Sequence, residues 1–220
     1  LFTNPHTPIK CGGAPQKIMY LAADYFKKNK IKTQVEFWSG GTRVFGVEKY
    51  ENTLKDVIAR YGINTQFFVK LVEIDGPNKK AKFVGIGEAN KDQEYWVEFD
   101  MLHVTPPQSA PDFIRNSPLA NAAGWMDVEK HTLQHHVYKN IFGCGDAANL
   151  PASRTGAAIR KQAPVLVSNL LSVMKGKSMM ASYDGYSSCP IITGYNKLVL
   201  AEFDYNNQPV ETFPFDQSKE

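Results

Sequence analysis

A cysteine lies where the sequence predicts that a strand turns into a helix, within the stretch IKCGGAPQK at Ile9–Lys17. Gly12 and Gly13 favour a tight turn because glycine adopts positive φ without steric cost, and Pro15 suits the first turn of a helix. Unpaired N–H groups and the helix dipole create a positive field at such a place. That field lowers the pKa of a thiol, and the thiolate is the reactive form, so Cys11 is a candidate nucleophile.

The chain has two further cysteines, Cys144 and Cys189, and its cysteines show neither CxxC spacing nor a histidine at metal-ligand distance. We therefore expect no metal site. Cys189 lies in the polar stretch YSSCP, which favours an accessible thiol in a turn, whereas an inert buried thiol is the alternative for both Cys11 and Cys189. His135 and His136 are adjacent and cannot share one helix face, so we expect solvated loop histidines.

Length and composition limit the class of protein. With 220 residues, 43% of them hydrophobic and 12% aromatic, the chain can form one large domain or two small ones with a real core. The net charge is +3, and the lysines and arginines are scattered along the sequence, so no basic cluster indicates nucleic-acid binding. We find no apolar run of about 18 residues and no signal peptide, and so few thiols favour a reducing compartment. The start LFTNPHTP is typical of the middle of a chain, so we expect a fragment.

The hydrophobic pattern predicts an α/β fold. Residues 9–75 alternate strand, helix, strand, helix, strand, which is typical of a Rossmann-like parallel sheet, and the hairpin that follows adds antiparallel strands. After the first strand and helix, the predicted elements are a strand at Thr33–Trp38, a helix at Glu48–Tyr61 that ends at Gly62, and strands at Gln66–Asp75, Ala81–Gly87 and Tyr95–Phe99.

The second half of the chain predicts fewer regular elements. The prolines of MLHVTPP end a strand, and residues 107–123 form a loop-rich boundary. We expect an apolar strand at Asn140–Asp146 and a helix at Thr155–Met174. The tail Tyr186–Pro214 predicts two or three strands, with a hairpin turn at DYNNQP.

The stretch GCGDAA matches the dinucleotide fingerprint only superficially, with Gly143, Gly145 and Ala148 at the expected spacing. Pro151 interrupts where a true fingerprint continues into its helix, and the Asp146 carboxylate would repel a pyrophosphate. That carboxylate can instead accept hydrogen bonds from the hydroxyls of a sugar or polyol, or it can cap the following turn. Local reasoning does not separate these two interpretations.

The longer stretch VYKNIFGCGDAANLP resembles the second flavin-binding motif of the flavoprotein disulfide reductase superfamily. Within it, PHTPIKCGGAPQK, MLHVTPP, YDGYSSCP, TGYNK and LAEFDY together resemble the sulfide:quinone oxidoreductases of the animal mitochondrial type, over essentially the whole chain. This resemblance implies a nicotinamide-type Rossmann-like domain at 1–105, the returning half of a flavin-binding domain at 106–182, and a β-rich C-terminal segment at 183–220.

The resemblance also implies FAD as cofactor and two redox-active thiols. Cys11 would be the cysteine beside the flavin and Cys189 its partner. Lys17 would supply positive charge to a thiolate or a flavin anion, although a solvated helix lysine is the alternative.

The same resemblance places further side chains beside the cofactor. These are Thr105 and Pro106 of MLHVTPP, together with Gly145 and Asp146 near the ribityl chain. Arg154 joins them, although the family has a lysine there and a planar guanidinium presents a different geometry from a point charge. Cys144 occupies a position that the superfamily fills with a small apolar residue, so we expect it to be structural.

The implied activity is the oxidation of hydrogen sulfide to a protein-bound persulfide, with electrons passed through FAD to ubiquinone. A small nucleophile such as glutathione would accept the sulfane sulfur, at the mitochondrial inner membrane. Membrane association in the family is peripheral and uses segments that this chain lacks, as it lacks GxGxxG, so we expect the isolated chain to retain little FAD. The alternatives are a nicotinamide-using flavoprotein such as a type II NADH dehydrogenase, against which CGGAPQK argues, and a catalytically silent flavoprotein-fold fragment.

Overall fold

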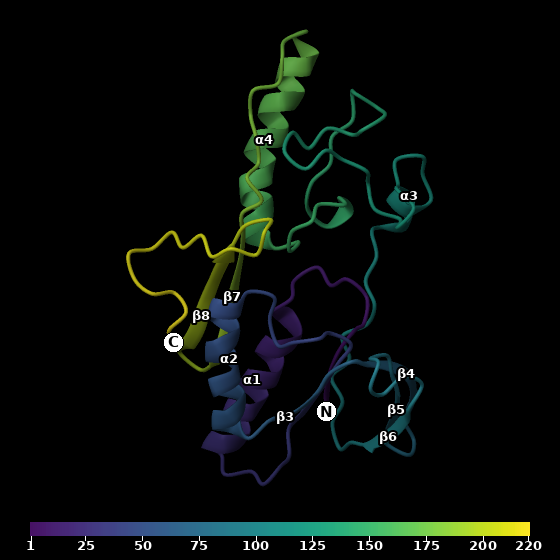
Figure 1. Cartoon of the computed structure of the whole chain (residues 1–220), viewed down its shortest axis with the longest axis vertical. Coiled ribbons are helices and arrows are strands. Elements are labelled where there is room, and N and C mark those ends of the chain that lie inside the picture. Colours follow the sequence, from purple (N-terminus) through teal and green to yellow (C-terminus); the bar gives the residue numbers. More distant parts are fainter. The chain divides into compact units, whose positions relative to one another are not determined.

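The computed structural model describes all 220 residues, and it has the predicted α/β fold (Figure 1). The chain divides into two compact units, each made of more than one stretch. Unit 1 consists of Leu1–Pro107, Pro190–Leu200 and Gln217–Glu220, and unit 2 consists of Gln108–Cys189 and Ala201–Asp216.

Unit 1 contains the predicted parallel sheet. Its strands are β1 (Phe2–Asn4), β2 (Glu36–Ser39) and β3 (Asn64–Gln66), which pair in that order. Helices α1 (Ala14–Lys28) and α2 (Glu48–Tyr61) connect the strands and lie side by side (Figure 1). The predicted alternation of strands and helices is confirmed, and α2 has the predicted bounds and ends at Gly62.

The first strand is placed differently from the prediction. It ends at Asn4, so a loop of residues 5–13 separates it from α1, and Cys11 lies in this loop rather than at a strand end. Pro5 and Pro8 explain the difference, because proline has no N–H to donate to a ladder. The cysteine is therefore held by the loop and by the helix start.

A second sheet in unit 1 is an antiparallel meander of β4 (Val69–Asp75), β5 (Lys80–Gly85) and β6 (Glu94–Glu98). The strand predicted at Gln66–Asp75 is divided between the two sheets, because the chain turns at Phe68, whose φ is +58°. Trp38 of β2 packs against Phe83 of β5, with ring centroids 4.7 Å apart. The meander therefore packs on the parallel sheet.

Unit 2 has little regular structure before its long helix. Its elements are α3 (Asp112–Arg115), a single 3-10 turn η1 (Gly145–Ala147) and α4 (Gly156–Met174). The predicted helix is confirmed, with Thr155 as its N-cap. The strand predicted at Asn140–Asp146 is wrong: only an isolated bridge at Phe142 forms, because no other segment of this chain runs beside it as a strand.

The tail forms a hairpin of β7 (Ser187–Gly194) and β8 (Lys197–Phe203), as predicted. The predicted turn at DYNNQP follows, where the Asp204 N–H donates to the Gln208 carbonyl at 3.1 Å. The chain crosses between the two units within this hairpin. Among the helices, none combines the length and apolar character needed to cross a membrane.

Candidate functional site

The Cys11 turn leads directly into α1. The Ala14 N–H donates to the Cys11 carbonyl at 3.0 Å, and Gly13 has φ −85° and ψ −13°. Neither glycine of the turn has a positive φ, so that part of the prediction is wrong; an ordinary helical approach replaces the expected left-handed turn. Cys11 and Lys17 are both half-buried, and Lys17 lies in the first turn of α1. The structure therefore places a thiol and an amine at one helix N-terminus.

A buried polar network packs beside this turn, and no sequence pattern predicts it. The Gln16 amide donates to the Val44 carbonyl at 2.6 Å and accepts from the Tyr20 hydroxyl at 2.9 Å. The Val44 N–H in turn donates to Glu51 at 3.1 Å. Hydrogen bonds, above all those from Arg43, lower the pKa of the Glu51 carboxyl to about 2, although burial alone would raise it. The network fixes the loop after β2 against the start of α1.

Thr105 lies at the carboxyl end of β1. His103 pairs in parallel with Phe2, and the Thr105 N–H then donates to the Thr3 hydroxyl at 3.1 Å. Pro106 follows directly. The loop that carries Cys11 leaves β1 at this same end, and ligands of parallel α/β sheets bind at the carboxyl ends of the strands. Within unit 1, the structure therefore brings the predicted residues to one edge of the sheet.

Two buried side-chain atoms at this edge have no hydrogen-bond partner in the chain: Asn4 Oδ1 and Thr7 Oγ1. Gly40 lies against the same loop, and a Cβ there would approach the His6 backbone within 2.3 Å. The close packing of Gly40 keeps the loop near the sheet, and the two oxygens are available to a polar group.

In unit 2, Gly145 has φ +63°, and a Cβ there would lie 2.8 Å from Ile159 Cδ1. The positive φ favours glycine, and any larger residue would also have to displace the end of the Ile159 side chain. The Gly145 N–H donates to Gln162 Oε1 at 2.8 Å, whereas the Asp146 side chain is exposed. The turn thus presents a carboxylate while its own backbone is held by α4, whose helix begins only at Gly156, as the interrupted fingerprint indicated.

Arg154 lies near the same turn. Its Nε donates to the Ala148 carbonyl at 3.0 Å, and its guanidinium lies over the Trp125 ring, 3.8 Å from the centroid. Burial lowers the pKa of Arg154, while the charge of Asp146 raises it. The Arg154 head group is therefore fixed by a ring and a carbonyl.

Cys189 differs from the expectation of an accessible turn. It lies in β7 and is 1% exposed, because alternate residues of this strand face inward. Ser187 lies on the same side of the strand, and its hydroxyl donates at 3.1 Å to the carbonyl of Ser153, the neighbour of Arg154. The polar residues of YSSCP led to the wrong prediction of an exposed thiol, because Ser187 and Ser188 are themselves buried.

Two other predictions concern unit 2. Cys144 is partly buried and packs on the hydrophobic core of the unit, and burial raises the pKa of its thiol, which supports a structural role. His136 is exposed, but His135 is buried, contrary to the prediction. Its ring bonds to the Leu119 carbonyl at 3.0 Å and accepts from the Val137 N–H at 3.0 Å.

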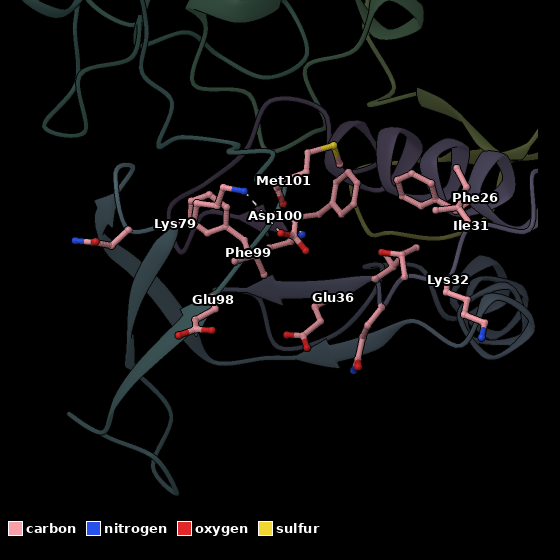
Figure 2. Close-up of a pocket in the computed structure, with 15 residues that line it drawn as sticks. Phe26, Ile31, Lys32, Glu36, Lys79, Glu98, Phe99, Asp100 and Met101 are labelled. Atoms are coloured by element: carbon pink, nitrogen blue, oxygen red, sulfur yellow. Dashed lines mark hydrogen bonds and ion pairs between the residues drawn. The ribbon is translucent and has the colours of Figure 1, made fainter.

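A pocket of about 920 Å³ lies elsewhere in unit 1 (Figure 2). Leu1 and residues 31–35 line it, so it lies at the amino ends of β1 and β2, and Lys79 pairs with Asp100 at its rim at 3.7 Å. None of the predicted site residues lines it. Because ligands of such sheets bind at the opposite edge, we do not assign the site to this pocket.

Comparison with known proteins gives full-length matches at the level of sequence. Proteins named mitochondrial sulfide:quinone oxidoreductase match from Mus musculus (46% identical over 100% of this chain and 49% of that protein), Dictyostelium discoideum (48%, over 100% and 48%) and Schizosaccharomyces pombe (39%, over 97% and 47%). No protein-family model matches.

Solved structures show the same fold. The sulfide:quinone oxidoreductase of Aquifex aeolicus matches with a TM-score of 0.77 at 17% identity, covering 92% of this chain and 50% of that chain. A chain of the Tetrahymena thermophila mitochondrial ATP synthase assembly matches with a TM-score of 0.81 at 24% identity, covering 94% and 50%. This chain thus spans about half the length of the curated relatives it matches. Over its own length, it belongs to the family of mitochondrial sulfide:quinone oxidoreductases.

Proposed function

We propose that the protein to which this chain belongs is an enzyme that oxidises hydrogen sulfide and passes the electrons through FAD to ubiquinone. The observation that carries the proposal is identity of 39–48% across nearly the whole chain to three proteins named for this reaction. The same names support a mitochondrial location, and we propose the inner membrane, with peripheral association through segments outside this chain.

The side chains of unit 2 fit a flavin cofactor. Asp146 presents an exposed carboxylate on a turn in which Gly145 has a positive φ, and a carboxylate accepts hydrogen bonds from ribityl hydroxyls. Arg154 adds a fixed positive charge. In unit 1, Thr105 and Pro106 at the sheet edge are the other proposed contacts. When bound, FAD supplies the two-electron acceptor chemistry.

Cys11 and Cys189 carry the sulfur chemistry in this proposal. Both are free thiols in this structure, and the proposal requires that they first form a disulfide, whose Cys189 sulfur hydrosulfide then attacks. A new S–S bond forms to Cys189, the bond between the cysteines breaks, and Cys11 leaves as a thiolate with the electron pair. Cys189 then holds a persulfide. A thiolate acceptor such as glutathione attacks the outer sulfur, which releases glutathione persulfide and the Cys189 thiolate.

The helix start explains why Cys11 would be the leaving sulfur. A disulfide breaks faster toward the sulfur whose thiolate is more stable. Cys11 precedes the N-terminus of α1, and Lys17 lies in its first turn, so both the dipole and the amine favour negative charge there. Cys189 lies within β7 and does not precede a helix in the sequence.

Replacement of the cysteines in the complete reading frame tests the proposal. We expect Cys11→Ser and Cys189→Ser each to lower sulfide-dependent quinone reduction by more than about a hundredfold, because serine forms no disulfide and holds no persulfide. Cys144→Ala, which changes only core packing, is the matched control and should retain activity. Unchanged activity in Cys189→Ser would overturn the proposal. NADH consumption without sulfide oxidation would favour the nicotinamide-using alternative.

A further inference from the structure

We propose that Gln16 is a positioning residue that holds the first turn of α1 in place behind Cys11, so that the helix start favours the thiolate of that cysteine. The inference deepens the proposed function and rests on it, because Cys11 is the sulfur proposed to leave as a thiolate. Every residue that carries the inference lies in unit 1.

The start of α1 lacks the side-chain contacts that usually hold a helix end. Gly13 occupies the N-cap, where no side chain bonds the first N–H groups, and the first turn carries no acidic residue. In a capping box, a glutamine at the position of Gln16 reaches back to the N-cap N–H, but here its amide bonds elsewhere. Because an uncapped helix end frays, the order of this turn depends on contacts from outside the helix.

The Gln16 side chain provides such a contact. It is 3% exposed, and its NH₂ group donates to the Val44 carbonyl at 2.6 Å. The hydroxyl of Tyr20, a buried residue one turn further along α1, donates to the Gln16 side-chain oxygen at 2.9 Å. Since the Val44 carbonyl can only accept, the NH₂ group faces it and the oxygen faces Tyr20. Both ends of the amide are therefore used.

The loop that carries Val44 is itself fixed to α2. The Val44 N–H donates to the carboxylate of Glu51 at 3.1 Å, and Arg43 Nε donates to the same carboxylate at 3.0 Å. Glu51 is buried, and hydrogen bonds to a charged group are stronger than those between neutral groups. The Val44 backbone is therefore a firm anchor for Gln16.

The same loop also reaches the other end of the turn. Phe45 is buried, and a Cβ on Gly12 would lie 4.0 Å from its ring, at ordinary contact distance. Between these points, the Ala14 N–H donates to the Cys11 carbonyl at 3.0 Å. The backbone that carries the thiol is thus held on one side by Phe45 and on the other by the Gln16 amide.

It follows that the Gln16 amide affects the chemistry of Cys11 without touching the thiol. The N–H groups of an ordered first turn favour a negative charge near the helix start, and this effect is lost when the turn opens. Loss of the amide should therefore destabilise the thiolate relative to the thiol.

The first test measures the pH at which Cys11 of the reduced complete protein becomes half-maximally reactive towards iodoacetamide, with mass spectrometry to separate it from the other thiols. We expect this midpoint to lie below about 8.5, the value of a free cysteine, in the parent. Gln16→Met keeps the length of the side chain and removes both hydrogen bonds, so it should raise the midpoint by about 0.5 unit. An equal midpoint in the parent and Gln16→Met would overturn the inference.

Tyr20→Phe and Tyr61→Phe form a matched pair of milder changes. Each removes one hydroxyl of unit 1, which donates to Gln16 in the first case and to the Thr193 carbonyl at 2.9 Å in the second. We expect Tyr20→Phe to raise the Cys11 midpoint by about 0.2–0.5 unit and Tyr61→Phe to leave it unchanged. Equal shifts in the two variants would show a general loosening of the unit and would contradict the inference. If Gln16→Met does not fold, this pair decides.

The fate of the proposed reaction can be told apart from that of the positioning role. A midpoint at or above about 8.5 in the parent would overturn the positioning role, while Cys11→Ser would still decide the sulfide chemistry. If Cys11→Ser retained activity, the proposed sulfur chemistry would fail, and a raised midpoint in Gln16→Met would still support the positioning role.

Discussion

Unit 1 and unit 2 are held together in different ways. In unit 1, six strands pair in two sheets, with one register shift between Leu71 and Glu73 of β4, and two helices connect the parallel strands. In unit 2, the stretch from 108 to 155 has isolated bridges in place of paired strands, besides the short α3 and η1, and buried amides of α4 bond to its loops. Unit 1 is therefore ordered mainly by sheet pairing, whereas unit 2 combines backbone hydrogen bonds between its loops, a hydrophobic core and hydrogen bonds from buried side chains.

The largest loss of stability is expected when a buried amide of α4 is removed. Asn169→Leu removes three hydrogen bonds to the backbone of Thr132 and Ala181 from a fully buried site. We expect the free energy of unfolding of unit 2 to fall by about 2–4 kcal/mol, because the backbone groups are left unsatisfied. Urea unfolding followed through Trp125, the tryptophan of unit 2, measures the loss.

Asn78→Ala in unit 1 is the control for that experiment. Asn78 also makes local hydrogen bonds, to Asp75 in the exposed turn between β4 and β5. We expect a loss below about 0.5 kcal/mol, because water replaces the lost partners. Equal losses in the two variants would mean that the two units do not differ in how they are held.

A second prediction concerns a buried charged side chain of unit 1. Glu51 is 2% exposed. Hydrogen bonds, above all those from Arg43, lower the pKa of its carboxyl from 4.5 to about 2, although burial alone would raise it. A carboxyl with a lowered pKa contributes stability above its unfolded pKa and loses it as the pH falls through the folded value. We expect Glu51→Gln to cost roughly 1–3 kcal/mol at neutral pH.

The measurement is unfolding of the parent and of Glu51→Gln between pH 7 and pH 2. The difference between the two should be largest at neutral pH and should shrink as the pH falls from about 4.5 to about 2. A difference that stays constant with pH would show that Glu51 acts by shape alone. Exposed Glu48, changed to glutamine, controls for the general loss of one charge on α2.

The sequence predicts the elements that depend on local pattern. Helix α2 has an amphipathic face and a glycine at its end, and both bounds were predicted from these features. The prediction of a strand at Asn140–Asp146 was wrong, because a strand forms only where another segment pairs with it. The local sequence pattern does not show whether such a partner is present. The Phe68 turn was missed for a related reason, since its positive φ has no signal in a non-glycine residue.

The candidate site divides in the same way. The helix after Cys11 follows from local chemistry and was predicted. Gln162 and Glu51 were missed, because a polar residue within an amphipathic pattern does not reveal that it is buried against a distant turn. The exposure of Cys189 was misjudged, since the serines around it are buried. Polar residue types are exposed on average, but this does not decide the exposure of any one residue.

The smallest effect is expected at Arg154, where unit 2 uses a side chain near its surface. The guanidinium stacks on Trp125 and donates to the Ala148 carbonyl, so Arg154→Lys keeps the charge and loses the planar stacking. We expect a loss of about 0.5–1 kcal/mol in the unfolding of unit 2, together with a change in Trp125 near-ultraviolet circular dichroism. Arg160→Lys on the exposed face of α4 should change neither. If Arg154→Lys also changes neither, the ring and the carbonyl do not restrain this side chain.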